Sequence, residues 1–183
     1  MRKSHLIVSV LLVFLTVTIL PARPTKIETV KNIDLDRYTG TWYEIARMPN
    51  KHEKGLVEVT STLKKVGKNK YMLISSGYKG SRGGKRSTLK GAVEIPDKNN
   101  TGNLKLKVFL FTVDFQIIDI DQENYNYALV TSDEGKNLWI FSRSPVMDPR
   151  DYKKMMDSAR DKGFEVASLE KVSQTSNSAY AER

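Results

Sequence analysis

The sequence predicts an all-β fold, an eight-stranded antiparallel up-and-down barrel with one C-terminal α-helix packed against its outside. Between Trp42 and Trp139, roughly 100 residues alternate apolar and polar side chains with the period of two that half-buried strands show. Clusters of Gly, Asn, Asp and Ser interrupt this pattern at hairpin spacing. A single segment of helical periodicity follows near the C-terminus.

The expected strands are short, and consecutive ones are joined by short connections such as the turn at 132–135. Short connections make consecutive strands antiparallel neighbours in the sheet. The clearest alternation lies in 104–110, where leucine and valine alternate with lysine. The eight strands are expected at residues 41–48, 57–64, 71–78, 89–95, 104–110, 115–120, 126–131 and 136–142.

Two helical segments are expected, a short one at 34–39 and a longer one that begins after Asp148. Asp148 is a favourable N-cap, and Pro149 suits the first helical position. Gly163 is expected to end this helix, and 164–172 to form a short final strand or an extended tail. The apolar stripe of the helix should pack on the outside of the barrel, against Leu138 and Ile140. Its members are Tyr152, Met155, Met156 and Ala159.

The N-terminus predicts an export signal. Arg2 and Lys3 precede the apolar run Leu6–Leu20, which is shorter than the roughly 20 residues of a membrane span. An uncleaved membrane anchor is the alternative. The expected organisation is a signal peptide at 1–22, a linker at 23–32, the barrel domain at 33–172 and a polar C-terminal tail at 173–183.

Composition excludes several classes of protein. The chain has 183 residues, a net charge of +9 and no cysteine, so neither a disulfide nor an acylated lipoprotein cysteine is available. The basic run Lys79–Lys90 is either a solvated loop or a contact for an anionic membrane surface. Nucleic-acid binding is disfavoured because no basic face carries interleaved aromatic residues.

Catalysis and metal binding find little support in the residue types present. The only histidines are His5, in the leader, and His52, in a lysine-rich loop. Without a cysteine or a second histidine in the domain, there is no thiol nucleophile, zinc cluster or Ser-His pair. We therefore expect no enzyme activity, no catalytic residue, no metal site and no cofactor.

Three motifs, taken in order, resemble those of the lipocalin family. They are Gly40-Thr41-Trp42 followed by Tyr43–Arg47, Asp121 (or Asp119) with Asn124-Tyr125, and Trp139–Pro145 with Arg143. The resemblance covers roughly residues 33–172. It is nearest to the branch of bacterial outer-membrane lipocalins, plant temperature-induced lipocalins and apolipoprotein D. Departures are the missing lipoprotein cysteine, His52 in place of the usual phenylalanine, and an apparent extra residue between Asp121 and Tyr127.

The motif residues are expected to close one end of the barrel. Antiparallel succession places Trp42, the 119–125 turn and Arg143 at the same end, where the guanidinium can stack on the indole and donate to nearby carbonyls. The resemblance implies the same structural role. The predicted structural set is Gly40, Trp42, Asp121, Tyr125 and Arg143.

A ligand is expected to enter at the opposite end, between the loops 49–55, 80–85, 112–114 and 132–135. We expect a fatty acid or lysophospholipid, held in a protein that is periplasmic or outer-membrane-associated if bacterial and otherwise secreted. Two alternatives stay open: an enzyme acting on lipid-like ligands, and a filled barrel that serves as a protein-interaction module. For each predicted wall residue, plain barrel core is an equal alternative. The wall residues are Val59, Ser61, Leu73, Ser75, Leu106, Val108, Leu110, Tyr127, Leu129, Trp139 and Phe141.

Overall fold

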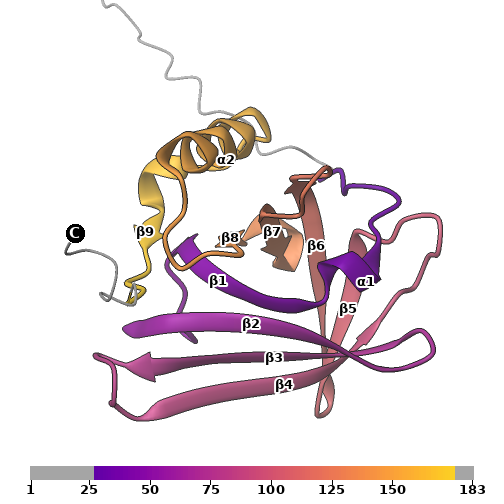
Figure 1. Ribbon diagram of the computed structural model, residues 1–183, viewed down its shortest axis with the longest axis horizontal. Helices are drawn as coiled ribbons and strands as arrows, with labels where there is room; N and C mark the ends of the chain where they lie inside the picture. Colours follow the sequence, from indigo (N-terminus) through magenta and orange to yellow (C-terminus); the bar gives the residue numbers. More distant parts are fainter. Residues whose placement is uncertain (1–26, 176–183) are drawn as a thin grey trace, which may run out of the picture.

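Eight consecutive strands form a closed antiparallel barrel in the computed structural model, which describes residues 27–175 (Figure 1). Each strand pairs with the next along the chain, and β1 pairs with both β2 and β8, which closes the barrel. The predicted fold class is confirmed. The strands are β1 Gly40–Arg47, β2 Leu56–Gly67, β3 Lys70–Lys79, β4 Arg86–Glu94, β5 Asn103–Val108, β6 Phe111–Ile120, β7 Tyr127–Ser132 and β8 Asn137–Ser142.

The turn between β5 and β6 differs from the expectation. The fifth strand ends at Val108 rather than at residue 110, and Phe109 and Leu110 form the turn. The segment 112–114, expected as a loop, lies inside β6. Phe109 adopts φ 55°, a backbone region that bulky residues seldom occupy. Turns are usually recognised in a sequence by Gly, Pro, Asn, Asp or Ser, and this turn consists of large apolar residues instead. The sequence pattern therefore predicts a strand that continues through the turn.

The seam between β1 and β2 is only partly closed by strand pairing. The two strands pair from Gly40 to Tyr43 and then diverge. Beyond that point the side-chain amide of Gln174 donates to the carbonyl oxygens of Glu44 and Val59, at 2.8 and 2.9 Å. The two-residue strand β9, Glu170–Lys171, pairs with the end of β1. The segment that follows the helix therefore completes the wall of the barrel.

Both expected helices form, and their caps explain where they begin. In α1 (Leu35–Tyr38) the Asp34 carboxylate accepts hydrogen bonds from the backbone N–H groups of Asp36 and Arg37. The helix α2 (Pro149–Asp161) begins after Asp148, whose side chain accepts from the N–H of Arg150. It ends at a lysine C-cap followed by Gly163 with φ 82°.

The helix α2 lies against the outside of the barrel (Figure 1). Met155 and Ala159 are buried in an outer apolar cluster with Leu138 and Ile140, as the sequence predicted. A second cluster fills the barrel interior and contains Trp42, Leu63, Leu104 and other inward residues. Within residues 27–175, no helix is long and apolar enough to cross a bilayer.

The segment that precedes α1 also contacts the barrel. Val30 donates from its backbone N–H to the carbonyl of Ile117 at 2.9 Å, and the Thr29 hydroxyl bonds to Asn100. A brief 3₁₀ turn at Val166–Ser168 follows α2 and leads to β9. The predicted signal peptide at 1–22 lies outside the described residues.

Candidate functional site

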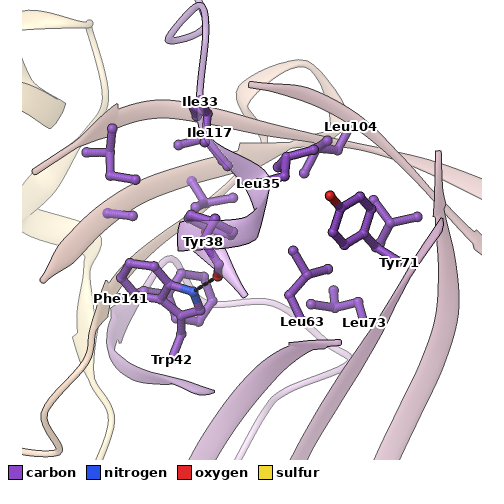
Figure 2. Packing of buried hydrophobic residues seen from close by; sticks show 14 of the residues in the cluster. Ile33, Leu35, Tyr38, Trp42, Leu63, Tyr71, Leu73, Leu104, Ile117 and Phe141 are labelled. Carbon is purple, nitrogen blue, oxygen red and sulfur yellow. Dashed lines mark hydrogen bonds between the residues drawn. The ribbon is translucent and has the colours of Figure 1, made fainter. Parts of the chain in front are cut away.

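One end of the barrel is closed by Arg143 and Trp42. The guanidinium carbon lies 3.8 Å from the centre of the Trp42 ring. Arg143 also donates to the carbonyl oxygens of Thr41, Arg37 and Tyr125, at 3.1, 2.9 and 3.3 Å. The Trp42 indole N–H in turn donates to the Tyr38 carbonyl at 2.9 Å, the dashed line in Figure 2. The predicted stacking of arginine on tryptophan is therefore present.

The other motif residues lie at the same end. The Asp121 carboxylate accepts from the backbone N–H groups of Asn124 and Asn126 and so shapes the turn between β6 and β7. The Tyr125 hydroxyl accepts from the Asp34 N–H at 3.0 Å, and the Arg37 guanidinium lies 4.2 Å from the Tyr125 ring centre. This end is a plug of backbone hydrogen bonds and stacked cations, with no opening for a ligand among its described contacts.

The deep half of the barrel is filled by apolar side chains. Figure 2 shows the inner cluster around Leu63, Leu73, Leu104 and Tyr71. A cavity of about 10 Å³, measured as space open to the centre of a water molecule, remains among them. That volume holds about one water. An alkyl chain does not fit there unless side chains move. Tyr38, Leu63, Leu73, Val93, Leu104, Leu106 and Phe115 line it.

Toward the open end the inner wall becomes partly exposed. Ser61 lies opposite Ser75 across β2 and β3, and Ser75 lies opposite Leu89 across β3 and β4. These three positions form one row on the inner face, and Leu89, at the far end of the row, is 45% exposed. Small side chains and an exposed leucine leave apolar surface in contact with water inside the mouth.

Trp139 stands on the opposite wall of the mouth. It is half-buried against the inner cluster, and its ring centre lies 6.2 Å from that of Phe115. Its indole N–H donates to a carboxylate oxygen of Glu53 at 2.9 Å. Because Glu53 belongs to the β1–β2 loop, this hydrogen bond fastens the loop to the barrel wall.

A buried, hydrogen-bonded pair of Glu44 and Arg47 lies on the inner face beside Trp139. Glu44 lies opposite Phe141, and Arg47 lies opposite Trp139 because a bulge between Glu44 and Ala46 shifts the register. Glu44 is 1% exposed and Arg47 4% exposed. The two side chains bond at 2.8 Å, and Arg47 also donates to the Leu56 carbonyl at 3.1 Å. The Arg47 Nε has no partner among the described residues.

The electrostatics of this pair favour a proton on Glu44. Burial, and then the negative charge of Glu53, raise the pKa of Glu44 to about 8, while the hydrogen bond and charge of Arg47 act in the opposite direction. A polar cluster of Glu44, Arg47, Glu53 and the Trp139 indole thus lies within a largely apolar wall. Sequence reasoning missed it. The alternation that places Trp42 inward also places Glu44 inward, but the bulge that turns Arg47 inward has no sequence signal.

For three residues, the prediction that they line the inner wall is wrong. Tyr127 and Leu129 belong to the outer cluster beneath α2, and the Tyr127 hydroxyl accepts from Lys154 of that helix at 2.9 Å. Their neighbours Ala128 and Val130 point inward instead. The reason is the register between β7 and β8, which sets Leu129 opposite the outward Ile140. Leu110 is 92% exposed in the β5–β6 turn and does not form part of the inner wall.

The other predicted wall residues keep inward positions. Leu73, Leu106 and Phe141 belong to the inner cluster, against which Val108 and Trp139 pack. Val59 and Ser61 are buried on the inward side of β2, and Ser75 continues their row. Which of them touch a ligand stays a prediction.

Other polar groups of the described chain offer no second centre. His52 is exposed and donates its backbone N–H to Asn50. Between residues 27 and 175 no group of three or more acidic or histidine side chains is placed to hold a metal ion. Asp119 accepts a hydrogen bond from Ser158 of α2, so its contact is with the helix rather than with a site.

Comparison with known proteins places this geometry in a family. The family described as "Lipocalin-like domain" matches residues 33–174. The outer membrane lipoprotein Blc of Citrobacter freundii is 34% identical over 171 residues, covering 92% of this chain and 96% of that protein. Temperature-induced lipocalin-1 of Arabidopsis thaliana is 28% identical over 160 residues, covering 82% and 84%. Among solved structures, insecticyanin of the tobacco hornworm Manduca sexta has a TM-score of 0.68 at 21% identity, covering 87% of this chain and 89% of that one. The chain belongs to the lipocalin family, as its three motifs predicted.

Proposed function

We propose that this protein binds a hydrophobic or amphiphilic small molecule, a fatty acid or a lysophospholipid, and stores or carries it in the mouth of the barrel. The observation that carries the proposal is the contrast between the two ends. One end is sealed by Arg143 and Trp42. At the other, inward apolar residues such as Leu89 and Trp139 stay partly exposed. A concave apolar surface open to water at one end is what a small hydrophobic ligand covers.

The chemistry of the mouth suits an amphiphile. The hydrocarbon would lie on Val108, Phe115 and Trp139, each Å² removed from water contributing about 25 cal/mol before ordering costs. The polar head would lie near Arg47 and the loop that carries Glu53. Because the deep cavity of about 10 Å³ is too small for an alkyl chain, the ligand occupies the upper half of the barrel or spreads the inner side chains.

A filled-barrel interaction module is the second candidate. The small deep cavity favours it, because a barrel that takes no ligand packs its interior with side chains. Lipocalins are usually non-enzymatic binding proteins, and the residue types of this chain agree with a role in binding. A lipid titration separates the two candidates.

Export is part of the proposal. The relative from Citrobacter freundii is named an outer membrane lipoprotein. This sequence has no cysteine to which a lipid could be attached in the same manner. We therefore propose an exported protein whose leader, residues 1–22, is removed and which carries no acyl chain.

Trp139 fluorescence tests the proposed site. The chain has two tryptophans, so Trp42→Phe isolates the Trp139 signal. A fatty acid or lysophospholipid should change that emission. Trp139→Ala should lower affinity by about tenfold or more, because a buried aromatic contact is lost. An anionic head should bind better than a neutral one, and less so at high salt, because the basic β3–β4 hairpin lies at the same end.

A matched control and a fallback keep this test decisive. Val66→Ser changes an exposed apolar residue of β2 outside the inner cluster and should leave affinity unchanged. If Trp42→Phe unfolds, the difference between wild type and Trp139→Phe supplies the same signal. Constant Trp139 emission during independently detected binding would show that the ligand lies elsewhere. Absence of any lipid binding would leave the interaction module.

A further inference from the structure

The strands β5 and β6 are joined by a tight hairpin (Figure 1). Its tip carries apolar side chains that the rest of the described chain, residues 27–175, leaves uncovered. Phe109 is 100% exposed, Leu110 92% and Phe111 74%. Elsewhere in the described chain, large exposed apolar side chains such as Val66 and Val146 occur singly. Three successive large apolar side chains in water are unfavourable unless something covers them.

The tip is also a firmly built structure. Val108 pairs with Phe111, so the ladder between β5 and β6 runs up to the two-residue turn. Phe109 holds φ 55°, a conformation that glycine or asparagine adopts far more readily. The chain therefore displays two phenylalanines and a leucine at a turn whose backbone favours a small or polar residue.

Positive charge accompanies the tip at the open end. The β3–β4 hairpin emerges at that end too, because alternate connections of an up-and-down barrel share one end. It carries Lys79, Arg82, Lys85 and Arg86, and the whole segment 79–90 has no acidic residue. Within residues 27–175, Arg82 forms a long ion pair with Glu58, at 3.7 Å, and its own side chain is 67% exposed.

We propose that the open end docks on an anionic lipid bilayer, with Phe109–Phe111 entering the boundary between headgroups and acyl chains and the β3–β4 hairpin lying on the lipid phosphates. Peripheral membrane proteins attach reversibly when apolar side chains insert into the interface and basic side chains are attracted to anionic lipids. The tip and the basic hairpin are separate contacts, because β4 and β5 pair only at Ala92–Glu94 and then diverge. The docking does not depend on the cavity ligand proposed above.

Vesicle flotation with the full chain tests this proposal. Vesicles of phosphatidylcholine and phosphatidylglycerol in equal parts are compared with vesicles of phosphatidylcholine alone. We expect wild type to float with the anionic vesicles and to be released by salt. The triple variant Phe109→Ser, Leu110→Ser, Phe111→Ser should bind about tenfold or more weakly. Arg82→Gln with Lys85→Gln should reduce binding to anionic vesicles only.

Matched variants separate docking from unrelated effects of the substitutions. All variants share one N-terminus, so any contribution of residues 1–22 cancels in the comparison. Val66→Ser removes an exposed apolar side chain outside the tip and should bind as wild type does. Leu110→Ser alone serves if the triple variant unfolds, because Leu110 lies in the turn without a positive φ. It should weaken binding by about threefold or more.

Three results would overturn the proposal. The first is equal vesicle binding by wild type and the tip variants. The second is binding to phosphatidylcholine alone that matches binding to anionic vesicles, since the basic hairpin would then contribute nothing. The third is a wild-type protein that does not bind vesicles but forms oligomers in analytical ultracentrifugation, while the triple variant stays monomeric. The tip would then be an interface between copies of this chain.

Discussion

Replacing Arg143 with alanine should loosen the closed end of the barrel. The substitution removes the guanidinium that lies 3.8 Å from the Trp42 ring centre. It also leaves the carbonyls of Arg37, Thr41 and Tyr125 without the donors that now lie at 2.9, 3.1 and 3.3 Å. Four contacts from three segments of the chain disappear together.

The expected loss follows from those contacts. Each hydrogen bond contributes about 0.5–1.5 kcal/mol to the free energy of unfolding. Values near the lower end apply here, because Arg143 is half-buried and water can donate to some of the carbonyls that the guanidinium leaves. The cation–π contact adds about 0.5–1 kcal/mol. The sum is about 2–3 kcal/mol of unfolding free energy. For a domain of this size it corresponds to a fall in Tm of about 5–10 °C.

Urea denaturation followed by circular dichroism measures this loss. Arg143→Lys keeps the charge but has a single donor nitrogen, so it should fall between wild type and alanine. Arg150→Ala is the matched control, because this arginine is exposed and, among the residues that the structure describes, its side chain pairs with Asp148 alone. The urea midpoint of Arg150→Ala should not change. If Arg143→Ala unfolds at the same urea concentration as Arg150→Ala, the plug does not hold the barrel end and the reasoning fails.

Three further outcomes are expected. Glu44 keeps its proton longer in the folded state, with a pKa of about 8 against an ordinary 4.5, so its contribution to stability should decline as pH rises between those values. Glu44→Gln should abolish that decline, by about 1 kcal/mol or more across the range, and urea midpoints at successive pH values measure it. Leu129→Ala, fully buried beneath α2, should lose about 2–5 kcal/mol of stability with lipid affinity unchanged, whereas Leu73→Ala on the inner wall should change affinity in a titration. Intact mass of the exported protein should show a start near Arg23 without an acyl chain, and retention of residues 1–22 would indicate a membrane anchor instead.

The sequence predicted those parts of the fold that depend on local chemistry. Period-two alternation located all eight strands, and the Asp148 cap and Gly163 located both ends of α2. The stacking of Arg143 on Trp42 followed from antiparallel succession alone. Each of these features is determined by residues that are close in sequence or by the order of the strands along the chain.

The failures come from register, which local chemistry does not determine. Tyr127 and Leu129 were placed on the wrong face because a shift of one residue exchanges the two faces of a strand. Leu129 lies opposite Ile140, which the sequence already places on the outward face, and this pairing shows that Leu129 faces outward too. Arg47 turns inward only because β1 is bulged, and no residue type in the strand marks that irregularity. The contribution of these residues to the site depends on pairings that form across the whole chain.

The pairing of β1 has a consequence for how the chain is made. This strand is synthesised first, yet its partners include β8 and β9, which end at Ser142 and Lys171. Until those segments have emerged, one edge of β1 presents unpaired N–H and C=O groups, which readily join other chains. Contacts between such distant segments also form slowly. A nascent chain that stalls before Lys171, or one released without its last residues, is therefore the species most prone to aggregate, and its survival depends on a chaperone or on rapid completion.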